Sequence, residues 1–282
     1  MAPAQVERII LLCGVMPQHN RRRRGSRVAR PYTSGMGTRG RSNLPKRLRW
    51  TAPFAWLFCA VVAHADQPAV PDTLQQRIAA CTSCHGVHGE GSSDSGFFPR
   101  LAGKPAGYLV LQMQNFQHGL RRYAPMEYTM RLLTPEYMRE IAEYFSSQQV
   151  PYERKPVPAL APSALQRGEQ LVTAGDPARQ VPPCQACHGK QLTGTEPSVP
   201  GLVGLPYDYI SSQLGSWRTH TRASAAPDCM AGIAMRLAPA DISAVSAWLA
   251  SREVPADTHP QPAGSITPPL RCGVLQAQGG GA

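Results

Sequence analysis

The chain has 282 residues, of which 42% are hydrophobic and 17% are charged, so it can bury a core and is not a disordered polyelectrolyte. Its formal net charge of +11 lies at one end, because residues 1–65 contain twelve of the 29 lysines and arginines and one of the 18 aspartates and glutamates. Residues 66–282 contain 17 of each sign and are formally neutral. The charge of this remainder gives no support to a nucleic-acid-binding surface, and we expect no nucleic acid as a partner.

Residues 1–65 have the features of a basic leader that ends in a signal peptide. Four basic residues, at 41, 46, 47 and 49, precede an apolar run at 52–63, and Ala63-His64-Ala65 stands directly before Asp66. A basic segment, a short apolar segment and an A-x-A site are typical of a secretory signal peptide, and about a dozen apolar residues are too few to span a bilayer comfortably. We therefore expect export to the periplasm, with an uncleaved anchor as the alternative.

Residues 1–35 are unusual for a signal peptide because they include four consecutive arginines, Arg21 to Arg24. A start at Met36 would leave a leader of ordinary length. A basic arm that binds nucleic acid is the other interpretation of this segment.

Two copies of the pattern C-x-x-C-H lie in the rest of the chain, at Cys81-Thr82-Ser83-Cys84-His85 and at Cys184-Gln185-Ala186-Cys187-His188. This pattern is typical of covalent haem c attachment, in which the two thiols add to the two vinyl groups of the haem. On a helical turn, cysteines at i and i+3 share one face and the histidine at i+4 lies beside them, where its imidazole can bind the iron. The sequence therefore predicts two covalently bound haem c groups, one held by Cys81, Cys84 and His85 and the other by Cys184, Cys187 and His188.

Three other uses of paired cysteines fit the sequence less well. The two halves of a zinc site are usually about 15–20 residues apart, whereas these motifs are 103 residues apart. A thioredoxin-like redox pair needs a β-α-β context, which the pattern does not indicate. Plain disulfides leave the histidine after both pairs unexplained.

The hydrophobic pattern predicts the same three helices around each motif. The first set is expected at 72–84, at 105–119 and from Pro135, and the second set at 163–174, at 206–218 and from Pro239. The last helix of each set has one apolar stripe with the spacing i, i+3, i+4, i+7, formed by Met138, Ile141, Ala142 and Phe145 in the first set and by Ile242, Val245, Ser246 and Leu249 in the second. The second set has a longer loop before its motif, and no strand pattern is visible.

The sequence that follows each motif repeats at an offset of 101–104 residues. The segment Phe98 to Pro105 matches Val199 to Pro206, and the segment that starts at Leu133 matches the one that starts at Leu237. Single residues also match, since Tyr108, Gln112, Phe116 and Met126 correspond to Tyr209, Gln213, Trp217 and Met230. The repeat predicts an all-α fold that contains a duplicated domain.

Segments rich in proline and glycine divide the chain between and after these domains. We expect a basic leader and signal peptide at 1–65, a first domain at 66–150, a stiff proline-containing linker at 151–162, a second domain at 163–255 and a tail at 256–282. The tail is expected either to wrap the second domain or to be disordered.

A haem iron with two strong protein ligands transfers electrons, so a second ligand is expected for each iron. Met126 follows His85 by 41 residues and Met230 follows His188 by 42, and both precede the last helix of their domain. We therefore predict His85 and Met126 as the iron ligands of the first haem, and His188 and Met230 as those of the second. Because a thioether disfavours oxidised iron relative to an imidazole, these pairs predict raised reduction potentials.

Other methionines are weaker candidates for this position. Methionine is more often core filler than ligand, and this interpretation fits Met113, Met138 and Met235, which have no methionine counterpart in the repeat. Met130 is the rival of Met126 in the first domain because it lies close in sequence.

Three histidines outside the motifs are also weaker candidates. His118 and His220 precede Met126 and Met230 by eight and ten residues, so bis-histidine ligation stays open, although surface positions at helix ends fit them better. His88 follows His85 too closely to reach the opposite face of the haem and is expected in solvent.

Two prolines and two cysteines complete the set of candidate residues. A metal-bound imidazole usually donates its other N–H to a carbonyl or a carboxylate. The carbonyl oxygens of Pro99 and Pro200, 14 and 12 residues after the motif histidines, are candidate acceptors, although simple turn prolines fit equally well. In an exported protein, Cys229 and Cys272 predict a disulfide that fixes the tail beside Met230, with a free buried Cys229 as the alternative.

On these residues the chain resembles the cytochrome c4 family of dihaem class I cytochromes. The resemblance covers roughly residues 72–253, and it is carried by the two C-x-x-C-H motifs, the segment Phe98 to Lys104, the helix that follows Leu133, and the segment Met230 to Leu237 with the helix through Trp248. It implies two tandem class I cytochrome c domains related by internal duplication. It also implies histidine–methionine ligation of both haems and periplasmic electron delivery to a terminal oxidase.

The resemblance implies an electron carrier, not an enzyme, that passes single electrons between redox proteins such as a quinol–cytochrome c reductase and a terminal oxidase. A loose association with the membrane is compatible with such partners. Two alternatives stay open, the cytochrome subunit of a dehydrogenase complex and a dihaem peroxidase. A peroxidase needs an open iron position and a polar distal group, and a methionine at both sixth positions disfavours it.

Overall fold

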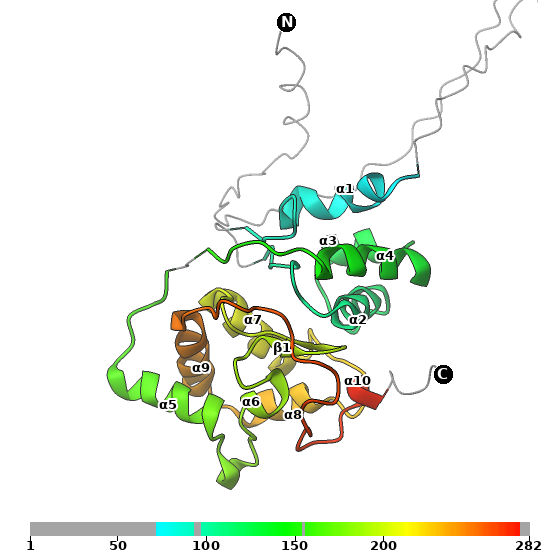
Figure 1. Cartoon of the computed structure of the whole chain (residues 1–282). Helices are drawn as coiled ribbons and strands as arrows, with labels where there is room; N and C mark the ends of the chain where they lie inside the picture. Colours follow the sequence, from blue (N-terminus) through cyan, green and yellow to red (C-terminus); the bar gives the residue numbers. More distant parts are fainter. Residues whose placement is uncertain (1–71, 93–96, 154–155, 277–282) are drawn as a thin grey trace, which may run out of the picture. The chain divides into compact units, whose positions relative to one another are not determined.

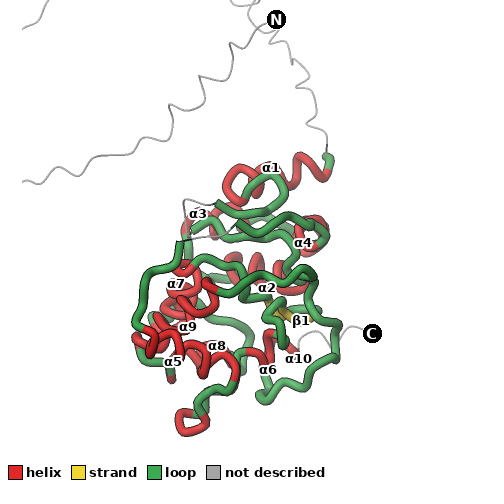
Figure 2. The backbone as a smooth tube through the Cα atoms, turned by 60° about the vertical axis from the view of Figure 1, so that its left-hand side comes forward, coloured by secondary structure: helices red, strands yellow, loops and turns green. Residues whose placement is uncertain are grey.

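The structure is a computed structural model that describes residues 72–92, 97–153 and 156–276. In this part of the chain the elements are short helices and one small two-stranded ribbon (Figures 1 and 2). The helices are α1 Leu74–His85, α2 Ala106–Gln117, α3 Ala124–Met130, α4 Pro135–Ser146, α5 Pro162–Thr173, α6 Gln185–His188, α7 Tyr207–Arg218, α8 Cys229–Arg236, α9 Pro239–Ser251 and α10 Gly273–Gln276, with a 3-10 turn at Pro177–Arg179 and strands β1 Gly194–Thr195 and β2 Val199–Pro200. The predicted leader and signal peptide lie outside the described residues. None of the helices described is both long enough and apolar enough to span a bilayer.

The first four helices enclose one hydrophobic core. α2 packs against α3 and α4, and α1 packs against α4. The apolar stripe predicted for the last helix is confirmed, because its four residues are all buried in this core. Thr134 caps α4 by accepting a hydrogen bond from the backbone N–H of Tyr137, and Pro135 occupies the first helical position, so this helix begins where the sequence predicts.

α5, α7, α8 and α9 enclose a second core, made of a different set of residues. α9 packs against both α5 and α7, and α8 packs against α7. The predicted stripe of α9 is buried, but Ala244, Ala247 and Trp248 are buried as well, so this helix is covered on most sides. Gly168 of α5 allows the two helices α5 and α9 to approach each other closely, because a Cβ atom at this position would collide with the carbonyl oxygen of Ala244 in α9. The described residues thus have two cores, one in each expected domain, while the internal duplication itself stays a prediction.

The sequence pattern predicts neither α3 nor α8. The two helices have seven and eight residues, about two turns each, which is too short for an apolar period to be recognised. Local bonds fix their starts instead. Asp228 accepts the N–H of Ala231 at the start of α8, and the Glu127 carboxylate accepts the N–H of Tyr123 at the start of α3. These helices carry the two methionines that are predicted as iron ligands.

The two motifs lie in different local structures. The first motif occupies the last turns of α1, which ends at His85. In the second half α5 ends at Thr173, and a loop with the 3-10 turn precedes the one-turn helix α6 that carries the motif. This confirms the longer loop predicted before the second motif. The β1–β2 ribbon was not expected, because two-residue strands are too short to show an alternating pattern.

Arg100 fixes the start of the predicted linker. Its guanidinium donates hydrogen bonds to the carbonyl oxygens of Val150 and Pro151 and lies 3.8 Å from the centre of the Tyr152 ring. The described residues of the linker contain no helix before Pro162, where α5 starts one residue earlier than predicted.

The described part of the tail wraps the second half. Gln261 pairs with Thr195 of β1, and Cys272 forms a disulfide with Cys229 at the start of α8. The predicted disulfide and the predicted wrapping are therefore confirmed, and the alternative of a free Cys229 is wrong.

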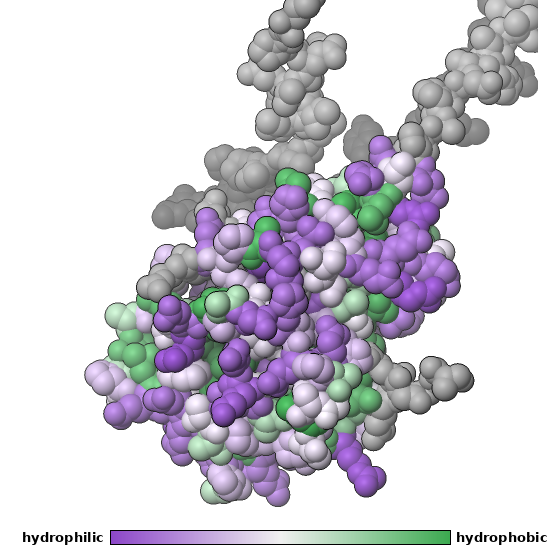
Figure 3. All heavy atoms as spheres, viewed as in Figure 1, coloured by the Kyte–Doolittle hydropathy of each residue, from purple (hydrophilic) through white to green (hydrophobic). Residues whose placement is uncertain are grey.

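Hydrophilic side chains dominate the face shown in Figure 3, and hydrophobic ones are scattered among them. The large exposed hydrophobic residues among those described are Val87, Phe97, Leu120, Tyr128, Leu132 and Met235. Scattered apolar residues of this kind are ordinary on a surface that faces water.

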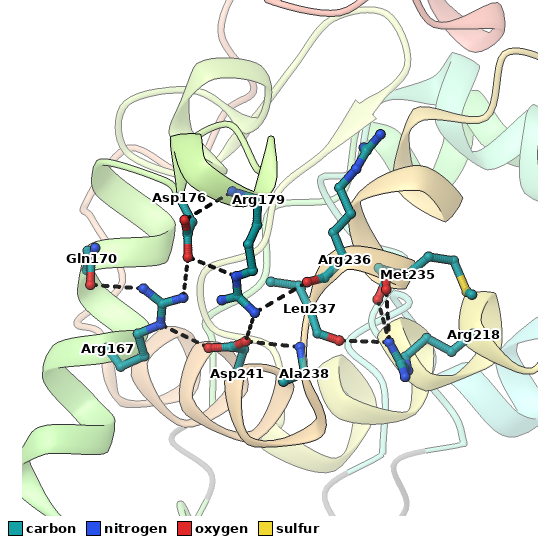
Figure 4. Close-up of polar contacts among 11 residues, drawn as sticks. Arg167, Gln170, Asp176, Arg179, Arg218, Met235, Arg236, Leu237, Ala238 and Asp241 are labelled. Carbon is teal, nitrogen blue, oxygen red and sulfur yellow. Dashed lines mark hydrogen bonds and ion pairs between the residues drawn. The ribbon is translucent and has the colours of Figure 1, made fainter.

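Figure 4 shows a ring of ion pairs that ties the loop before the second motif to α5 and α9. Arg167 of α5 lies 2.6 Å from Asp176 in the loop and 2.9 Å from Asp241 in α9. Arg179 in the loop closes the ring at 2.9 Å from Asp176 and 2.8 Å from Asp241. Burial acts to raise the pKa of Asp241, but the hydrogen bonds from Arg179 and Arg167 outweigh it and lower the pKa to about 2.

We expect Asp241→Asn to lower the free energy of unfolding by about 1–3 kcal/mol, because two arginines lose a charged acceptor. The folded pKa of Asp241 lies below its unfolded value, so this stabilisation is fully present above about pH 4 and is lost as the pH falls towards 2. Thermal unfolding between about pH 2 and about pH 7 should show the variant and the wild type converging at low pH. Glu136→Gln is the control, because it removes an exposed pair with Arg139 at 3.7 Å and the charge of one carboxylate at the start of α4, and it should lower the midpoint less than D241N does. A loss for D241N that is no larger than that of the control would contradict the role given to the ring.

Candidate haem sites

The first motif presents its histidine from the end of α1. His85 is buried, and its Nδ1 atom lies 2.8 Å from the carbonyl oxygen of Pro99. Cys84 is exposed and Cys81 is partly buried. Because the carbonyl accepts the proton of Nδ1, the Nε2 atom keeps the lone pair that an iron ion needs. The predicted role of Pro99 as acceptor is confirmed.

The second motif has the same arrangement on α6. His188 is buried, and its Nδ1 atom lies 2.7 Å from the carbonyl oxygen of Pro200 in β2. The Thr195 hydroxyl of β1 donates to the carbonyl oxygen of Cys187 at 3.2 Å, so the ribbon holds the motif at two points. The predicted role of Pro200 is confirmed as well, and the ribbon explains how the carbonyl is placed.

Burial dominates the electrostatics of both motifs. It lowers the pKa of His85 and of His188, and the charge of Arg121 adds to this effect at His85 while that of Lys104 adds to it at His188. Both imidazoles are therefore neutral near pH 7, as metal ligation requires. Burial also raises the pKa of the Cys81 thiol to about 11. The Cys184 thiol has its pKa raised to about 12, and neither thiol has the low pKa of a reactive redox cysteine.

Each predicted methionine packs against the same core as the motif of its domain. Cys81 and Met126 both contact the first core, and Cys184 and Met230 both contact the second. The rival Met130 is 2% exposed and is part of the interior of the first core. The assignment of Met126 and Met230 as ligands stays a prediction, now with each methionine on the short helix beside its own core.

The remaining methionines and histidines fall into two groups. Met113 and Met138 are buried in the first core, as expected for core filler, but Met235 is 52% exposed, so this prediction is wrong for Met235. The reason is its position near the end of α8, on the side that the second core does not cover. His88, His118 and His220 are exposed, the last two at the ends of α2 and α7, which confirms the surface positions preferred for them.

A cavity in the second half brings the predicted residues together. Cys184, Cys187, His188 and Met230 all line it. Most of the remaining lining is apolar, with Ile210, Leu214, Trp217, Val245 and Leu249 contributed by α7 and α9. An apolar enclosure that offers two thiols, one imidazole and one thioether fits a covalently attached porphyrin and its iron.

Sequence reasoning missed the residues that other parts of the chain contribute to this cavity. Lys104, Tyr108 and Gln112 reach it from the first half, and Leu270 and Val274 reach it from the tail. Residues that meet across two domain surfaces show no periodic pattern in the sequence. No sequence pattern could therefore have placed these residues at the cavity. The basic residue at position 104, where the repeat has Leu205, was the one visible hint.

A helical fold with two sites of this kind is that of a dihaem c-type cytochrome, and comparison with known proteins identifies its family. Cytochrome c4 of Pseudomonas aeruginosa is 32% identical to this chain over 190 residues, which are 67% of this chain and 90% of that protein. The chain belongs to the cytochrome c4 family. No protein-family model matches it.

A second relative and two solved structures extend the comparison. A thiosulfate dehydrogenase electron acceptor of Thiomonas intermedia is 32% identical over 205 residues, covering 73% of this chain and 86% of that protein. The structure of reduced recombinant cytochrome c4 from Pseudomonas stutzeri matches 64% of this chain and 96% of its own, with a TM-score of 0.53 and 29% identity. A thiosulfate dehydrogenase of Marichromatium purpuratum matches 62% of this chain with a TM-score of 0.55 and 30% identity, but the match covers only 36% of that protein.

These findings confirm three predictions made from the sequence. The chain carries two covalently bound haem c groups, it transfers electrons, and it is a carrier, not an enzyme. The assignment of the individual residues rests on the geometry above.

The disulfide between Cys229 and Cys272 gives a prediction for the second site. It joins residues 43 positions apart and starts one residue before Met230. Replacing both cysteines by serine should lower the free energy of unfolding by about 2–4 kcal/mol, because the unfolded chain regains the freedom of the open loop. Denaturant unfolding followed by circular dichroism measures this loss. The double variant Met113→Leu/Met138→Leu is the control. It changes two buried residues of the first core and leaves the bridge intact, so it shows how a change of core packing alone affects the unfolding curve. An unfolding curve of the serine variant that matches the wild type would contradict the role of the bridge.

Proposed function

We propose that this chain is a periplasmic dihaem cytochrome that passes single electrons between respiratory partners, towards a terminal oxidase. It consists of two tandem class I cytochrome c domains, at 66–150 and 163–255, joined by a linker at 151–162 and related by internal duplication. The observation that carries the proposal is the matched setting of the two motif histidines. Each is buried, and each donates to a proline carbonyl oxygen at 2.8 or 2.7 Å.

The order of the helices supports the duplication. α2, α3 and α4 follow the first motif, and α7, α8 and α9 follow the second, with lengths of 12, 7 and 12 residues against 12, 8 and 13. The backbones of Arg121 and Arg222 pair with each other in an antiparallel bridge. These two arginines are 101 residues apart, which lies within the 101–104-residue offset of the repeat.

The residues of each domain prepare an iron site for fast electron transfer. The haem, when bound, supplies the iron that changes oxidation state. The proline carbonyls hold His85 and His188 with Nε2 free and make each imidazole a better donor. The thioethers of Met126 and Met230 favour the reduced state and so raise the reduction potential. The apolar lining of the second cavity excludes water and adds to this effect.

Export to the periplasm rests on two features. The A-x-A sequence at 63–65 follows an apolar run in the predicted leader. The Cys229–Cys272 bridge is of a kind that persists in oxidising compartments and is rare in the cytosol.

The identity of one electron donor is a second proposal, because two relatives point to it. Proteins of Thiomonas intermedia and Stutzerimonas stutzeri that are 32% and 33% identical to this chain are named thiosulfate dehydrogenase electron acceptors. We infer that a thiosulfate dehydrogenase reduces this cytochrome.

Stopped-flow reduction of the purified protein by a thiosulfate dehydrogenase, in the presence of thiosulfate, tests this donor. Both haems should become reduced at a rate that rises with the concentration of the dehydrogenase. Mixing the protein with thiosulfate alone is the control and should give no comparable reduction. If the dehydrogenase does not accelerate reduction over this control, the proposed donor is wrong while the electron-carrier function stands.

Substitution of the two methionines tests the iron ligands. Met126→Ala and Met230→Ala should each remove about half of the far-red absorbance band of methionine-bound ferric haem and lower one of the two reduction potentials. Met130→Leu in the first domain and Met235→Leu in the second are matched controls that should keep both bands and both potentials.

Loss of the band in M130L with its retention in M126A would transfer the role to Met130. Rapid binding of carbon monoxide by the reduced wild-type protein would indicate an open iron position, and this would favour the peroxidase alternative over electron transfer.

A further inference from the structure

Three cations meet between the two halves, around the phenol of Tyr108. Lys104 and Arg222 are buried, with 6% and 7% of their surface exposed, and Arg121 is half-buried. Arg222 lies 3.4 Å from the Tyr108 oxygen. The charges of all three cations act on this phenol and, against its burial, lower its pKa to about 8.

Neutral groups are the only acceptors that the described residues offer to these cations. Arg121 donates to the side-chain oxygens of Gln112 at 3.0 Å and of Gln213 at 2.7 Å, and Arg222 donates to the same two oxygens at 3.2 and 2.7 Å. Lys104 donates to the carbonyl oxygen of Gly201 at 3.4 Å. No carboxylate of the described residues forms an ion pair with any of the three. Because buried charge is costly unless it is paired, this cluster requires an anion that the described polypeptide does not provide.

The cavity of the second half supplies the place for that anion. Lys104 and Arg222 line the same cavity as Cys184, Cys187 and His188. A haem has an apolar ring and two carboxylate side chains, and this cavity has an apolar body and a cationic end. The fit of charge and polarity therefore assigns the cationic end to the haem carboxylates.

Each half contributes one arginine to this cluster, but only the first half contributes a lysine. Arg121 stacks on Phe116 of the first half at 4.7 Å, and Arg222 stacks on Trp217 of the second at 4.0 Å. Lys104 has no cationic counterpart, because the matching position of the repeat is Leu205.

The contact of Lys104 places its charge on the side of the second haem. Gly201, whose carbonyl oxygen accepts from Lys104, directly follows Pro200, whose carbonyl oxygen holds His188. The second site thus receives one buried positive charge more than the first.

We propose that Lys104, together with Arg222, binds a propionate carboxylate of the second haem and raises the reduction potential of this haem. This inference rests on the proposed function. Ferric haem carries one more positive charge than ferrous haem, so a fixed cation nearby disfavours the oxidised state. Lys104, a residue of one domain, thus tunes the cofactor of the other.

Spectroelectrochemical titration of the intact dihaem protein and its Lys104→Gln variant tests the proposal. One of the two potentials, that of the second haem, should fall in K104Q, and the other should stay in place. The equilibrium constant for sharing an electron between the two haems should change at least tenfold, which corresponds to about 59 mV for a one-electron couple. Lys104→Arg, which keeps the charge, should retain most of the wild-type difference.

Lys190→Gln is the matched control for the loss of a positive charge in the second domain. Lys190 lies two residues after His188, but it is exposed, so water and salt screen its charge. K190Q should change the sharing constant less than twofold. Equal shifts in K104Q and K190Q, or unchanged potentials in K104Q, would overturn the proposal.

Lys104→Met keeps the volume of the side chain and removes its charge, so it replaces K104Q if the glutamine variant does not fold. A protein that binds no haem would instead contradict the proposed function, so the two failures are distinguishable.

Discussion

A buried imidazole that donates its Nδ1 proton to a proline carbonyl oxygen recurs in both halves, and the rest of the fold is organised around it. An N–H group buried without an acceptor would cost about 1–3 kcal/mol, so this bond fixes the plane and the tautomer of each ring. At His85 the acceptor follows in a loop after α1, whereas at His188 it is part of the β1–β2 ribbon. Two different local structures thus present the same histidine geometry, as the predicted role of both histidines as iron ligands requires.

The features that could be predicted from the sequence are those with a fixed chemical spacing or a long period. The two C-x-x-C-H motifs indicate haem attachment directly, and the stripes of α4 and α9 are long enough for their burial to be recognised. The acceptor prolines could also be predicted, because a metal-bound imidazole needs an acceptor for its second N–H. The Cys229–Cys272 bridge could be predicted because these two cysteines lie outside the motifs of an exported chain. These features determine the fold class, the cofactor and the general role.

The features that could not be predicted depend on short elements or on surfaces in contact. α3 and α8 are about two turns long and are fixed by capping bonds of Glu127 and Asp228, which are weak signals in a sequence. Met235 was expected inside because its residue type is apolar, yet α8 turns it to solvent. The position of Lys104 in the cavity of the other half depends on how two domain surfaces meet, and a sequence carries no periodic record of that contact.

The central claim is that both cysteine pairs are joined to haem, and that the motif histidines would bind the two iron ions. Mass spectrometry of the exported, mature protein tests it most directly. The account predicts a mass that exceeds that of the polypeptide by two haem groups, with one haem on the peptide that contains Cys81 and Cys84 and one on the peptide that contains Cys184 and Cys187. A mass equal to that of the polypeptide alone, with free thiols or disulfides at these four positions, would contradict it.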